Sequence, residues 1–447
     1  MESKPSYSYH AEPFELAERP RRFLEAFSAI LKHSNYGPVL DSYIRLSTKC
    51  ARCTASCPVY EASSDPRDVP CMRSELLFRV YRRYFTIAGQ LRARLFDDFT
   101  LTDEYIDHMA EEMWRCTACK RCKSFCPMGI DHGMITHLSR WILSEIGITP
   151  KAMVVSVREQ LEGKTKNTSA IPMVAMKDSC EFLEEELEEM FPDQKIKFPM
   201  DVEGAEYVFF PAVSDYLMEA DTLMGNAAML HATGTSWTIG TQNFDGIDYG
   251  LFCSDRMWDR IIKAQVEEIK RLKGKVMLIG ECGHASRSAK EGMQNFIPPE
   301  DRVPVVNIME LAYEHFKSGR LKLKKGVIKK KTTYHDPCNI ARKGWIIEQP
   351  REILRHICED FVEMTPRGKD NYCCGGGGGT VSIDEIHEFR MLIGGKTKAE
   401  QIKRTGAYYI VAPCANCKKQ TEEIIKAHKI DAQKVGLHDL LLKAIEF

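Results

Sequence analysis

The 447-residue sequence contains no long hydrophobic run. No uninterrupted apolar stretch approaches the roughly 18–20 residues that a membrane-spanning helix needs, so we expect the chain not to cross a membrane by itself. The first ten residues are polar and lack the apolar core of a secretory signal. We therefore expect a cytoplasmic protein, a compartment in which thiols stay reduced.

An excess of charge of either sign is also missing. The sequence has 62 Lys+Arg against 63 Asp+Glu, a formal net charge of -1, which gives no electrostatic reason to expect nucleic acid as a partner. Charged residues make up 28% and hydrophobic residues 44%, a globular composition that excludes wholesale disorder. At roughly 100–200 residues per domain, the length predicts two to four domains.

Cysteine, in contrast, is abundant, with 17 residues. In a reducing compartment this number indicates metal ligands rather than a disulfide scaffold. Thirteen of the cysteines fall in three clusters, within residues 50–71, 116–126 and 338–417. The scattered ones, which are more often small buried side chains than ligands, are Cys180, Cys253, Cys282 and Cys358.

The clearest motif is a run of four cysteines directly followed by Pro127. Its spacing, C-x2-C-x2-C-x3-C-P, is typical of loops that bind 4Fe–4S cubes. A structural zinc site is the alternative, but the short spacings and the proline favour iron–sulfur. The cysteines of this run are Cys116, Cys119, Cys122 and Cys126.

A second run lies upstream and ends at Pro58, with Ser47 where the first cysteine is expected. In two-cluster ferredoxins the fourth cysteine of each run ligates the other cluster. One predicted cluster therefore uses Cys57, Cys116, Cys119 and Cys122, and the other receives Cys50, Cys53 and Cys126. Between the runs, apolar residues at helical spacing over 74–84 and 103–114 predict an all-helical ferredoxin domain.

The second cluster lacks one ligand in this scheme. Three cysteines are compatible with a 3Fe–4S centre, a serine-ligated cube or a cysteine borrowed from outside the run. Cys71 is the predicted donor, because Pro66 and Pro70 break regular structure and let the segment form a loop over the cluster. A thiolate also binds iron better than the hydroxyl of Ser47, whose pKa is far higher. A buried cysteine without a ligand role is the alternative.

Residues 201–447 contain two related halves. In the second half, predicted strands at 332–335 and 407–412 flank a glycine run and a helical stretch at 384–405, with five cysteines placed around them. The first half repeats this order with strands at 207–210 and 276–279 and a helix at 255–272, which indicates a duplicated α/β unit. The five cysteines of the second half are Cys338, Cys373, Cys374, Cys414 and Cys417. The matching positions of the first half hold Ala212, Phe244, Asp245, Cys282 and Ala285, so the first half is predicted to be a scaffold, a wall or a docking surface.

Two further features belong to this region. The glycines that follow Cys374, beginning with Gly375 and Gly376, predict a close approach of the backbone to a cluster. Cys282 occupies the position that matches Cys414, with His284 two residues on. We expect it to face the substrate pocket as a redox partner or an extra ligand, with a buried small side chain as the alternative.

The pattern Cys338…Cys373-Cys374-Gly375…Cys414-x-x-Cys417 resembles the cysteine-rich CCG domain of heterodisulfide reductases. With the two-cluster ferredoxin domain before it, the chain from about residue 45 to 447 resembles the HdrD-type fusion. The segments 334–338, 349–352 and 280–285 make it similar to DsrK, HmcF and TmcB subunits. Subunits of glycolate oxidase and anaerobic glycerol-3-phosphate dehydrogenase share this plan and serve flavoprotein partners.

The resemblance implies a noncubane 4Fe–4S centre on the five CCG cysteines, which together with Cys282 would be the catalytic residues, and two cubane 4Fe–4S clusters that supply it with electrons. It also implies reduction of a disulfide or trisulfide, such as that of a DsrC-like partner, with electrons from a membrane cytochrome b that oxidises quinol. The chain would then lie on the cytoplasmic face of the cell membrane, held by partner subunits. The alternatives are an electron-relay subunit without its own substrate and an iron–sulfur partner of a flavin dehydrogenase.

The predicted fold is an α-helical two-cluster ferredoxin domain followed by a duplicated α/β cysteine-rich domain. A helical segment at 1–40, whose amphipathic part at 21–33 docks on a partner or packs as an ordinary helix, precedes the ferredoxin domain at 41–150. A polar linker at 151–200 follows, and its acidic amphipathic stretch at 180–191 predicts a solvated helix that bridges two domains. The two repeats then occupy 201–325 and 326–447.

Overall fold

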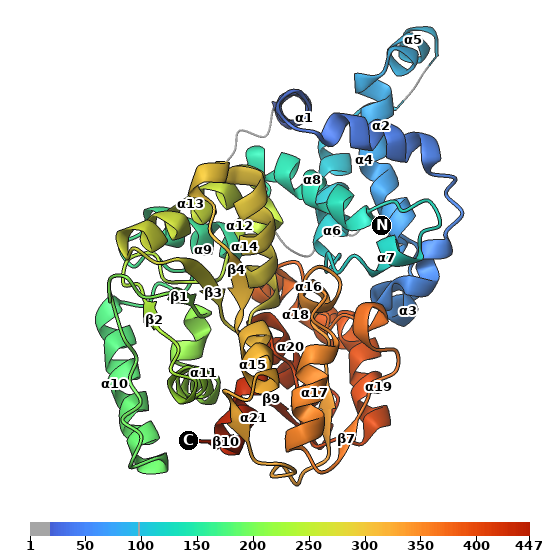
Figure 1. Ribbon diagram of the computed structural model, residues 1–447. Coiled ribbons are helices and arrows are strands. Elements are labelled where there is room, and N and C mark those ends of the chain that lie inside the picture. The colour runs from blue at the N-terminus through green and yellow to red at the C-terminus, as the bar shows by residue number, and fades with distance from the viewer. Residues whose placement is uncertain (1–17, 97–98) are drawn as a thin grey trace. The chain divides into compact units, whose positions relative to one another are not determined.

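The computed structural model describes residues 18–96 and 99–447 (Figure 1). The chain forms two compact units. Unit 1 contains the residues up to Val154 together with 252–255 and 375–397, and unit 2 contains 155–251, 256–374 and 398–447. The first 17 residues of the predicted N-terminal segment lie outside the described part. Among the described residues, no helix is both long enough and apolar enough to span a membrane.

Unit 1 is helical, as predicted. Helix α6 covers the predicted range Asp103–Trp114, because the Thr102 hydroxyl accepts the N–H of Tyr105 at 3.3 Å and acidic residues fill the first turn. Its other helices are α1 (Arg19–His33), α2 (Tyr36–Leu46), α3 (Pro58–Ser63), α4 (Pro70–Phe85), α5 (Ile87–Leu95), α7 (Arg121–Phe125), α8 (His132–Glu145) and the short α18 (His387–Phe389).

The amphipathic stretch at 21–33 lies in α1 and uses its apolar face inside unit 1. Phe23 and Phe27 are fully buried and Ile30 nearly so. The ring centroid of Phe27 lies 4.7 Å from that of Phe85 on α4. The described part of the predicted docking segment is therefore an ordinary packed helix.

Unit 2 contains two four-stranded parallel sheets with the same strand order. In each sheet the strand that comes first in the sequence lies between the second and the third, and the fourth strand pairs with the outer side of the third. The first sheet consists of β1 (Tyr207–Phe210), β2 (Trp237–Ile239), β3 (Val276–Ile279) and β4 (Val305–Asn307). The second consists of β6 (Thr332–Tyr334), β7 (Phe361–Val362), β8 (Tyr409–Val411) and β9 (Gln433–Val435). A small antiparallel pair joins β5 (Lys322–Leu323) to β10 (Ile445–Glu446).

The central strands carry apolar runs because helices cover both faces of a parallel sheet. In β1, Val208, Phe209 and Phe210 are all fully buried. The longer helices of unit 2 are α10 (Met173–Met190), α11 (Ala220–Ala232), α13 (Asp255–Arg271, which starts at the unit boundary), α14 (Gly283–Phe296), α15 (Ile308–Lys317), α17 (Glu348–Ile357), α20 (Ala415–Ala427) and α21 (Leu437–Ala444). The short helices are α12 (Gly250–Cys253) and α16 (Cys338–Ala341).

Two predictions about this region are met only in part. The acidic stretch of the segment 151–200 is helical as predicted, since α9 (Lys151–Glu162) and α10 fill most of this segment, but α10 is not solvated on every side. The buried residues of α10 recur every three or four positions between acidic ones, so they form a packed stripe: Met176, Cys180, Leu183 and Leu187. The single helix predicted over 384–405 is also interrupted. A π-helical turn at 390–394 separates α18 from α19 (Lys396–Thr405), next to the glycine pair Gly394-Gly395.

Candidate metal centres

Four cysteines of unit 1 line one cavity of about 390 Å³. They come from the upstream run, from the last position of the downstream run and from the start of α4. Ser47 and Pro127 line the same cavity. The four cysteines are Cys50, Cys53, Cys71 and Cys126.

Cys71 reaches this cavity from a helix rather than from the predicted loop. Pro70 occupies the first turn of α4, where its missing N–H is no loss, so the proline starts the helix and Cys71 follows within the first turn. A hydrogen bond with the Cys53 thiol, together with backbone N–H groups of Ala51, Cys71 and Met72, lowers the pKa of Cys71 to about 6. The pair therefore holds one sulfur as a thiolate inside the cavity.

A second cavity of unit 1 brings together Cys57 and the first three cysteines of the downstream run, Cys116, Cys119 and Cys122. Pro58 also lines this cavity and starts α3 directly after Cys57. The exchange of the fourth cysteine between the two runs is thus the arrangement that the spacing predicts.

The two cysteine loops share the same backbone conformation. Lys49 and Ala51, on either side of Cys50, have positive φ angles of 54° each. Ala118 and Lys120, on either side of Cys119, have φ angles of 48° and 60°. Non-glycine residues rarely adopt this conformation, so its occurrence at matching positions marks the loops as two copies of one cluster-binding turn.

Arg140 of α8 fixes the downstream loop. Its guanidinium is almost fully buried and donates to the carbonyl of Met113 at 2.8 Å, to that of Cys116 at 2.6 Å and to that of Gly378 at 2.8 Å. The group also stacks over the ring of Trp114 at 4.0 Å. These contacts satisfy carbonyls at the point where the chain leaves α6 for the cysteine loop.

Both cavities fit iron–sulfur cubes by the chemistry of their donors. Each presents four cysteine sulfurs, and soft thiolates select iron–sulfur clusters or zinc over hard cations. The alternation of ligands between two neighbouring cavities is a property of two-cluster ferredoxins that paired zinc sites do not require.

In unit 2, four buried sulfurs form a chain of contacts. The Sγ atoms of Cys374 and Cys417 lie 3.5 Å apart. Cys417 is hydrogen-bonded to Cys414, and Cys414 to Cys282. Of the remaining two predicted site residues, Cys373 directly precedes Cys374, and Cys338 starts α16 directly after the loop that leaves β6.

Cys282 and Cys414 occupy equivalent places in the two halves. Each is the N-cap of the helix that follows the third strand, α14 and α20 respectively. Each donates its N–H at 2.7 Å to the carbonyl two residues earlier. The two helix starts also meet, because the Ala415 N–H donates to the Glu281 carbonyl at 3.0 Å.

Hydrogen bonds control the charge of these sulfurs. Bonds with Cys282 and Cys417 hold the pKa of Cys414 well below its usual value, whereas burial raises that of Cys282. The Sγ atom of Cys282 also lies 3.2 Å from Nδ1 of His284. Cys282 thus lies beside the predicted centre.

Three polar side chains that the sequence alone did not single out lie beside these sulfurs. A ring nitrogen of His335 lies within 4.8 Å of the Sγ atoms of Cys374 and Cys417. Asn371 places its amide nitrogen 3.4 Å from Nδ1 of His335 and accepts from Lys398 at 3.0 Å. All three polar side chains are at most 1% exposed.

The hydrogen bonds that link Lys398, Asn371 and His335 determine which ring nitrogen of His335 carries the proton. Lys398 can only donate, so the oxygen of Asn371 faces it and the amide nitrogen faces His335. Nδ1 of His335 therefore accepts, and burial lowers the pKa of the ring so that it stays neutral. The proton then resides on Nε2, which is buried and has no hydrogen-bond partner within the described protein.

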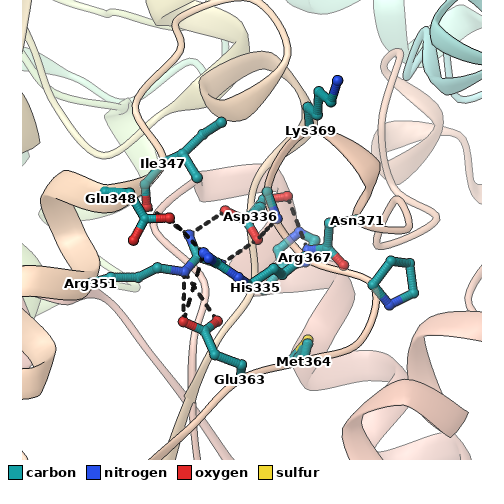
Figure 2. A network of polar contacts seen from close by, with 12 residues as sticks. His335, Asp336, Ile347, Glu348, Arg351, Glu363, Met364, Arg367, Lys369 and Asn371 are labelled. Carbon is teal, nitrogen blue, oxygen red and sulfur yellow. Dashed lines mark hydrogen bonds and ion pairs between the residues drawn. The ribbon is translucent and has the colours of Figure 1, made fainter.

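Asp336 and Arg351 anchor the segment that carries His335 and Cys338. Figure 2 shows Arg351 between two carboxylates, those of Asp336 and Glu363. Both bonds from Arg351 to Asp336 are 2.7 Å long and both side chains are fully buried, while its Nε donates to Glu363 at 2.9 Å. Asp336 also accepts the Gly368 N–H at 2.7 Å. This network ties the end of β6 to α17 and to the loop before Asn371.

Replacing Arg351 with methionine should destabilise unit 2 by about 3–5 kcal/mol, because it leaves the carboxylate of Asp336 buried without its counter-charge. Denaturant unfolding of the anaerobic protein would measure this loss. Arg355→Met is the matched control, since Arg355 lies one turn further along α17, is 48% exposed and also pairs with Glu363. The exposed ion pair between Arg355 and Glu363 should contribute only about 0–1 kcal/mol to the free energy of unfolding. Equal losses in the two variants would show that the buried network has no special role.

The glycine run after Cys374 belongs to unit 1. Gly375 has a φ of +100°, and a Cβ there would lie 2.7 Å from the backbone of Gly394. A Cβ on Gly378, where φ is +65°, would lie 2.9 Å from the backbone of Thr117, which lies between two cysteines of the downstream run. The glycines at 375 and 378 are thus required for close backbone packing, and at Gly378 this packing is against the downstream cysteine loop. For Gly376, a contact to a cluster stays a prediction.

Comparison with known protein families agrees with this division of the chain. Residues 48–130 match a 4Fe-4S dicluster domain, and residues 332–422 match a cysteine-rich domain of the CCG type. The two matched segments contain both cysteine runs, Cys71 and all five CCG cysteines.

Three curated relatives cover most of the chain. The Hdr-like menaquinol oxidoreductase iron-sulfur subunit 2 of Archaeoglobus fulgidus is 27% identical over 95% of this chain and 83% of its own length. A subunit of the dihydromethanophenazine:CoB–CoM heterodisulfide reductase of Methanosarcina mazei is 24% identical over 89% of this chain and 93% of its own. A probable membrane-anchored ferredoxin of Chromohalobacter salexigens is 26% identical over 71% of this chain and 45% of its own length.

These matches confirm the resemblance that the cysteine motifs indicate. They also confirm the order of a helical dicluster domain and an α/β cysteine-rich domain. The chain is related over most of its length to the iron–sulfur subunits of heterodisulfide-reductase-like oxidoreductases and carries a 4Fe-4S dicluster domain and a cysteine-rich CCG domain.

Proposed function

We propose that this chain is the subunit of an electron-transfer complex that reduces a disulfide or trisulfide of a partner molecule at a five-cysteine centre in unit 2. The observation that carries the proposal is the buried chain of sulfurs from Cys374 through Cys417 and Cys414 to Cys282. Together with Cys338 and Cys373, these four cysteines provide more sulfurs than the four that a cubane cluster needs.

Three iron–sulfur centres follow from the donor sets. A cubane 4Fe–4S cluster in the smaller cavity would be held by Cys57, Cys116, Cys119 and Cys122, and one in the larger cavity by Cys50, Cys53, Cys71 and Cys126. A noncubane 4Fe–4S centre would be held by Cys338, Cys373, Cys374, Cys414 and Cys417. Bound there, the clusters would accept electrons one at a time and deliver them to the substrate sulfurs.

The two halves of unit 2 have different proposed roles, since only the second half has the five cysteines of the centre. Their shared strand order supports the proposal that they are repeats of one unit. Of the five matching positions, the first half has a cysteine only at Cys282, which we assign to the substrate side of the centre, next to Cys414. Its other equivalents are apolar or carboxylate side chains such as Phe244 and Asp245, so this half forms a wall rather than a second centre.

His335 and Lys398 tune the centre through charge and hydrogen bonding. The Nε2–H of His335 is the proton that a thiolate of Cys374 or Cys417 would accept in a hydrogen bond, because Nδ1 is used by Asn371. Burial lowers the pKa of Lys398 to about 8, which leaves most of the side chain charged at pH 7. Its hydrogen bonds go to neutral groups, Asn371, Gln401 and Met364, so its counter-charge comes from charged groups nearby. These are the thiolates of Cys374, Cys373 and Cys417 and the carboxylate of Asp336.

Lys398→Met should therefore lower the reduction potential of the unit 2 centre. A buried positive charge favours the more negative, reduced form, and its removal should shift the midpoint on the order of tens of millivolts. A redox titration followed by electron paramagnetic resonance would measure the shift. Gln401→Leu is the control, because it removes a hydrogen bond of Lys398 but no charge. A shift of the same size in both variants would assign the effect to packing.

The relatives' names indicate the source of the electrons. One is a menaquinol oxidoreductase subunit and another belongs to a dihydromethanophenazine-dependent enzyme. We assign the electron donor of this chain to a membrane cytochrome b that oxidises quinol, with the chain held at the inner membrane face by such subunits. Isolation of the native complex tests this assignment: haem in the complex and reduction of the clusters by menaquinol would support it. Flavin without haem would place the chain with a flavin dehydrogenase.

An electron relay without substrate chemistry is the second candidate. It is favoured by the similarity to a probable membrane-anchored ferredoxin. A relay would reduce an artificial electron acceptor but would release no thiols from a disulfide. A reductase would release thiols, and loss of the unit 2 centre would stop that release.

A further inference from the structure

Helix α5 of unit 1 has an apolar stripe that faces outward. Ile87, Leu91 and Leu95 are four residues apart, so they lie on one face of the helix, and they are 81%, 52% and 74% exposed. Phe96, which follows them, is 67% exposed, and no residue of α5 is buried. Four large apolar side chains grouped in this way are typical of a docking surface.

The stripe lies on a firmly held element. Figure 1 shows α5 at the outer end of unit 1, beyond α4. A Cβ on Gly89 would lie 1.9 Å from the carbonyl oxygen of Arg82, so the two helices meet backbone to backbone. The hydroxyl of Thr86 caps α5 by accepting the N–H of Gly89 at 3.1 Å. The outward direction of the stripe is thus set by the packing of α5 on α4.

The sequence around the stripe has an excess of arginine. Residues 75–98 contain five arginines and three acidic residues, Glu75, Asp97 and Asp98, although the whole chain has a net charge of -1. Four of the arginines line a cavity of about 410 Å³ beside α5, where Glu75 pairs with Arg82 and the guanidinium of Arg79 stacks over Phe99 at 4.3 Å. The five arginines are Arg79, Arg82, Arg83, Arg92 and Arg94.

We propose that the α5 surface, defined as the four exposed apolar residues and these five arginines, binds directly to an anionic phospholipid bilayer. The apolar stripe would enter the interfacial region, and the guanidinium groups would pair with headgroup phosphates. Charge complementarity favours a phospholipid surface, because an apolar protein surface would cover the stripe without accounting for the excess of arginines over acidic residues in this segment. The chain would then have its own membrane contact in addition to any partner subunit, whether or not the proposed disulfide chemistry holds.

Sedimentation with lipid vesicles tests this proposal on the full, cluster-loaded chain. Vesicles of phosphatidylcholine with about one-third phosphatidylglycerol should bind the chain, and vesicles of phosphatidylcholine alone should bind it far more weakly. Arg92→Gln with Arg94→Gln should weaken binding about 25-fold, from about fivefold per arginine. Leu91→Gln with Leu95→Gln should weaken it at least about tenfold. High salt should weaken binding of the unchanged chain.

The matched control is Val174→Gln with Phe182→Gln, two apolar residues of α10 that are 69% and 59% exposed. This control should bind like the unchanged chain, and all variants should keep their iron and their helix content, because α5 buries no side chain. Equal binding to neutral and anionic vesicles would overturn the proposal. So would unchanged binding of the α5 variants, or association of the chain with itself or with a membrane subunit through α5 in the absence of vesicle binding.

Discussion

Cys374→Ala should remove the unit 2 centre and reduce disulfide reduction to background, while both clusters of unit 1 remain. Cys374 is one of the five proposed ligands and its Sγ atom lies 3.5 Å from that of Cys417, so its loss leaves the ligand set incomplete. Iron analysis should fall from about 12 to about eight atoms per chain, from three four-iron centres to two. The signals of the two cubanes should stay unchanged.

Cys358→Ala is the control for this variant. Cys358 is equally buried in unit 2, at 6% exposed, yet lies where α17 ends and away from the sulfur chain in sequence. This control should retain about 12 iron atoms and full turnover. Loss of all three centres in Cys374→Ala would instead indicate that Cys374 has a general role in folding. An iron content near eight atoms in the unchanged, fully loaded protein would show that unit 2 holds no four-iron centre.

Cys71→Ala should convert the cluster of the larger unit 1 cavity into a 3Fe–4S form or abolish it. The reason is that Cys71 completes a set of four sulfurs in that cavity and its pKa is held at about 6 by Cys53 and by backbone N–H groups. Electron paramagnetic resonance of the oxidised variant would show the signal of a three-iron centre. The chain should lose about one iron atom if a 3Fe–4S form remains, and about four if the cluster is lost.

Ser47→Ala separates the two ligand hypotheses, because Ser47 lines the same cavity and occupies the motif position of the absent cysteine. If Cys71 is the ligand, Ser47→Ala should keep the four-iron spectrum. An unchanged spectrum in Cys71→Ala together with a three-iron signal in Ser47→Ala would assign the ligand to the serine.

Local patterns predicted those features that depend on short stretches of sequence. Strands β1 and β3 have their predicted limits because each is a short apolar run, and α6 because Thr102 caps it. The grouping of Cys71 with the upstream run was also predictable from the shortage of ligands, but its position on the first turn of α4 was not. A proline in the sequence is compatible with the break of a helix and with the start of one. Only the structure shows that Pro70 starts α4.

Features that depend on distant residues could not be predicted. The acidic stretch on α10 gave no sign that its apolar positions are covered, since burial depends on what packs against it. The glycine run was expected to approach a cluster closely, whereas its packing against the backbone of Gly394 and Thr117 is a property of the tertiary fold. Lys398 and Asn371 lie 27 residues apart and have no motif, so their chain to His335 is visible only in the structure.

The central claim is that electrons held by this chain split a sulfur–sulfur bond, and a single-turnover measurement tests it most directly. The anaerobic, fully reduced chain is mixed with a protein that carries one disulfide or trisulfide, and cluster oxidation and thiol release are followed together. The account predicts that two electrons leave the clusters for each disulfide cleaved into two thiols, and that Cys374→Ala releases none. Reduced clusters that stay reduced, with no thiol released from any disulfide-bearing partner, would contradict the account and leave an electron relay.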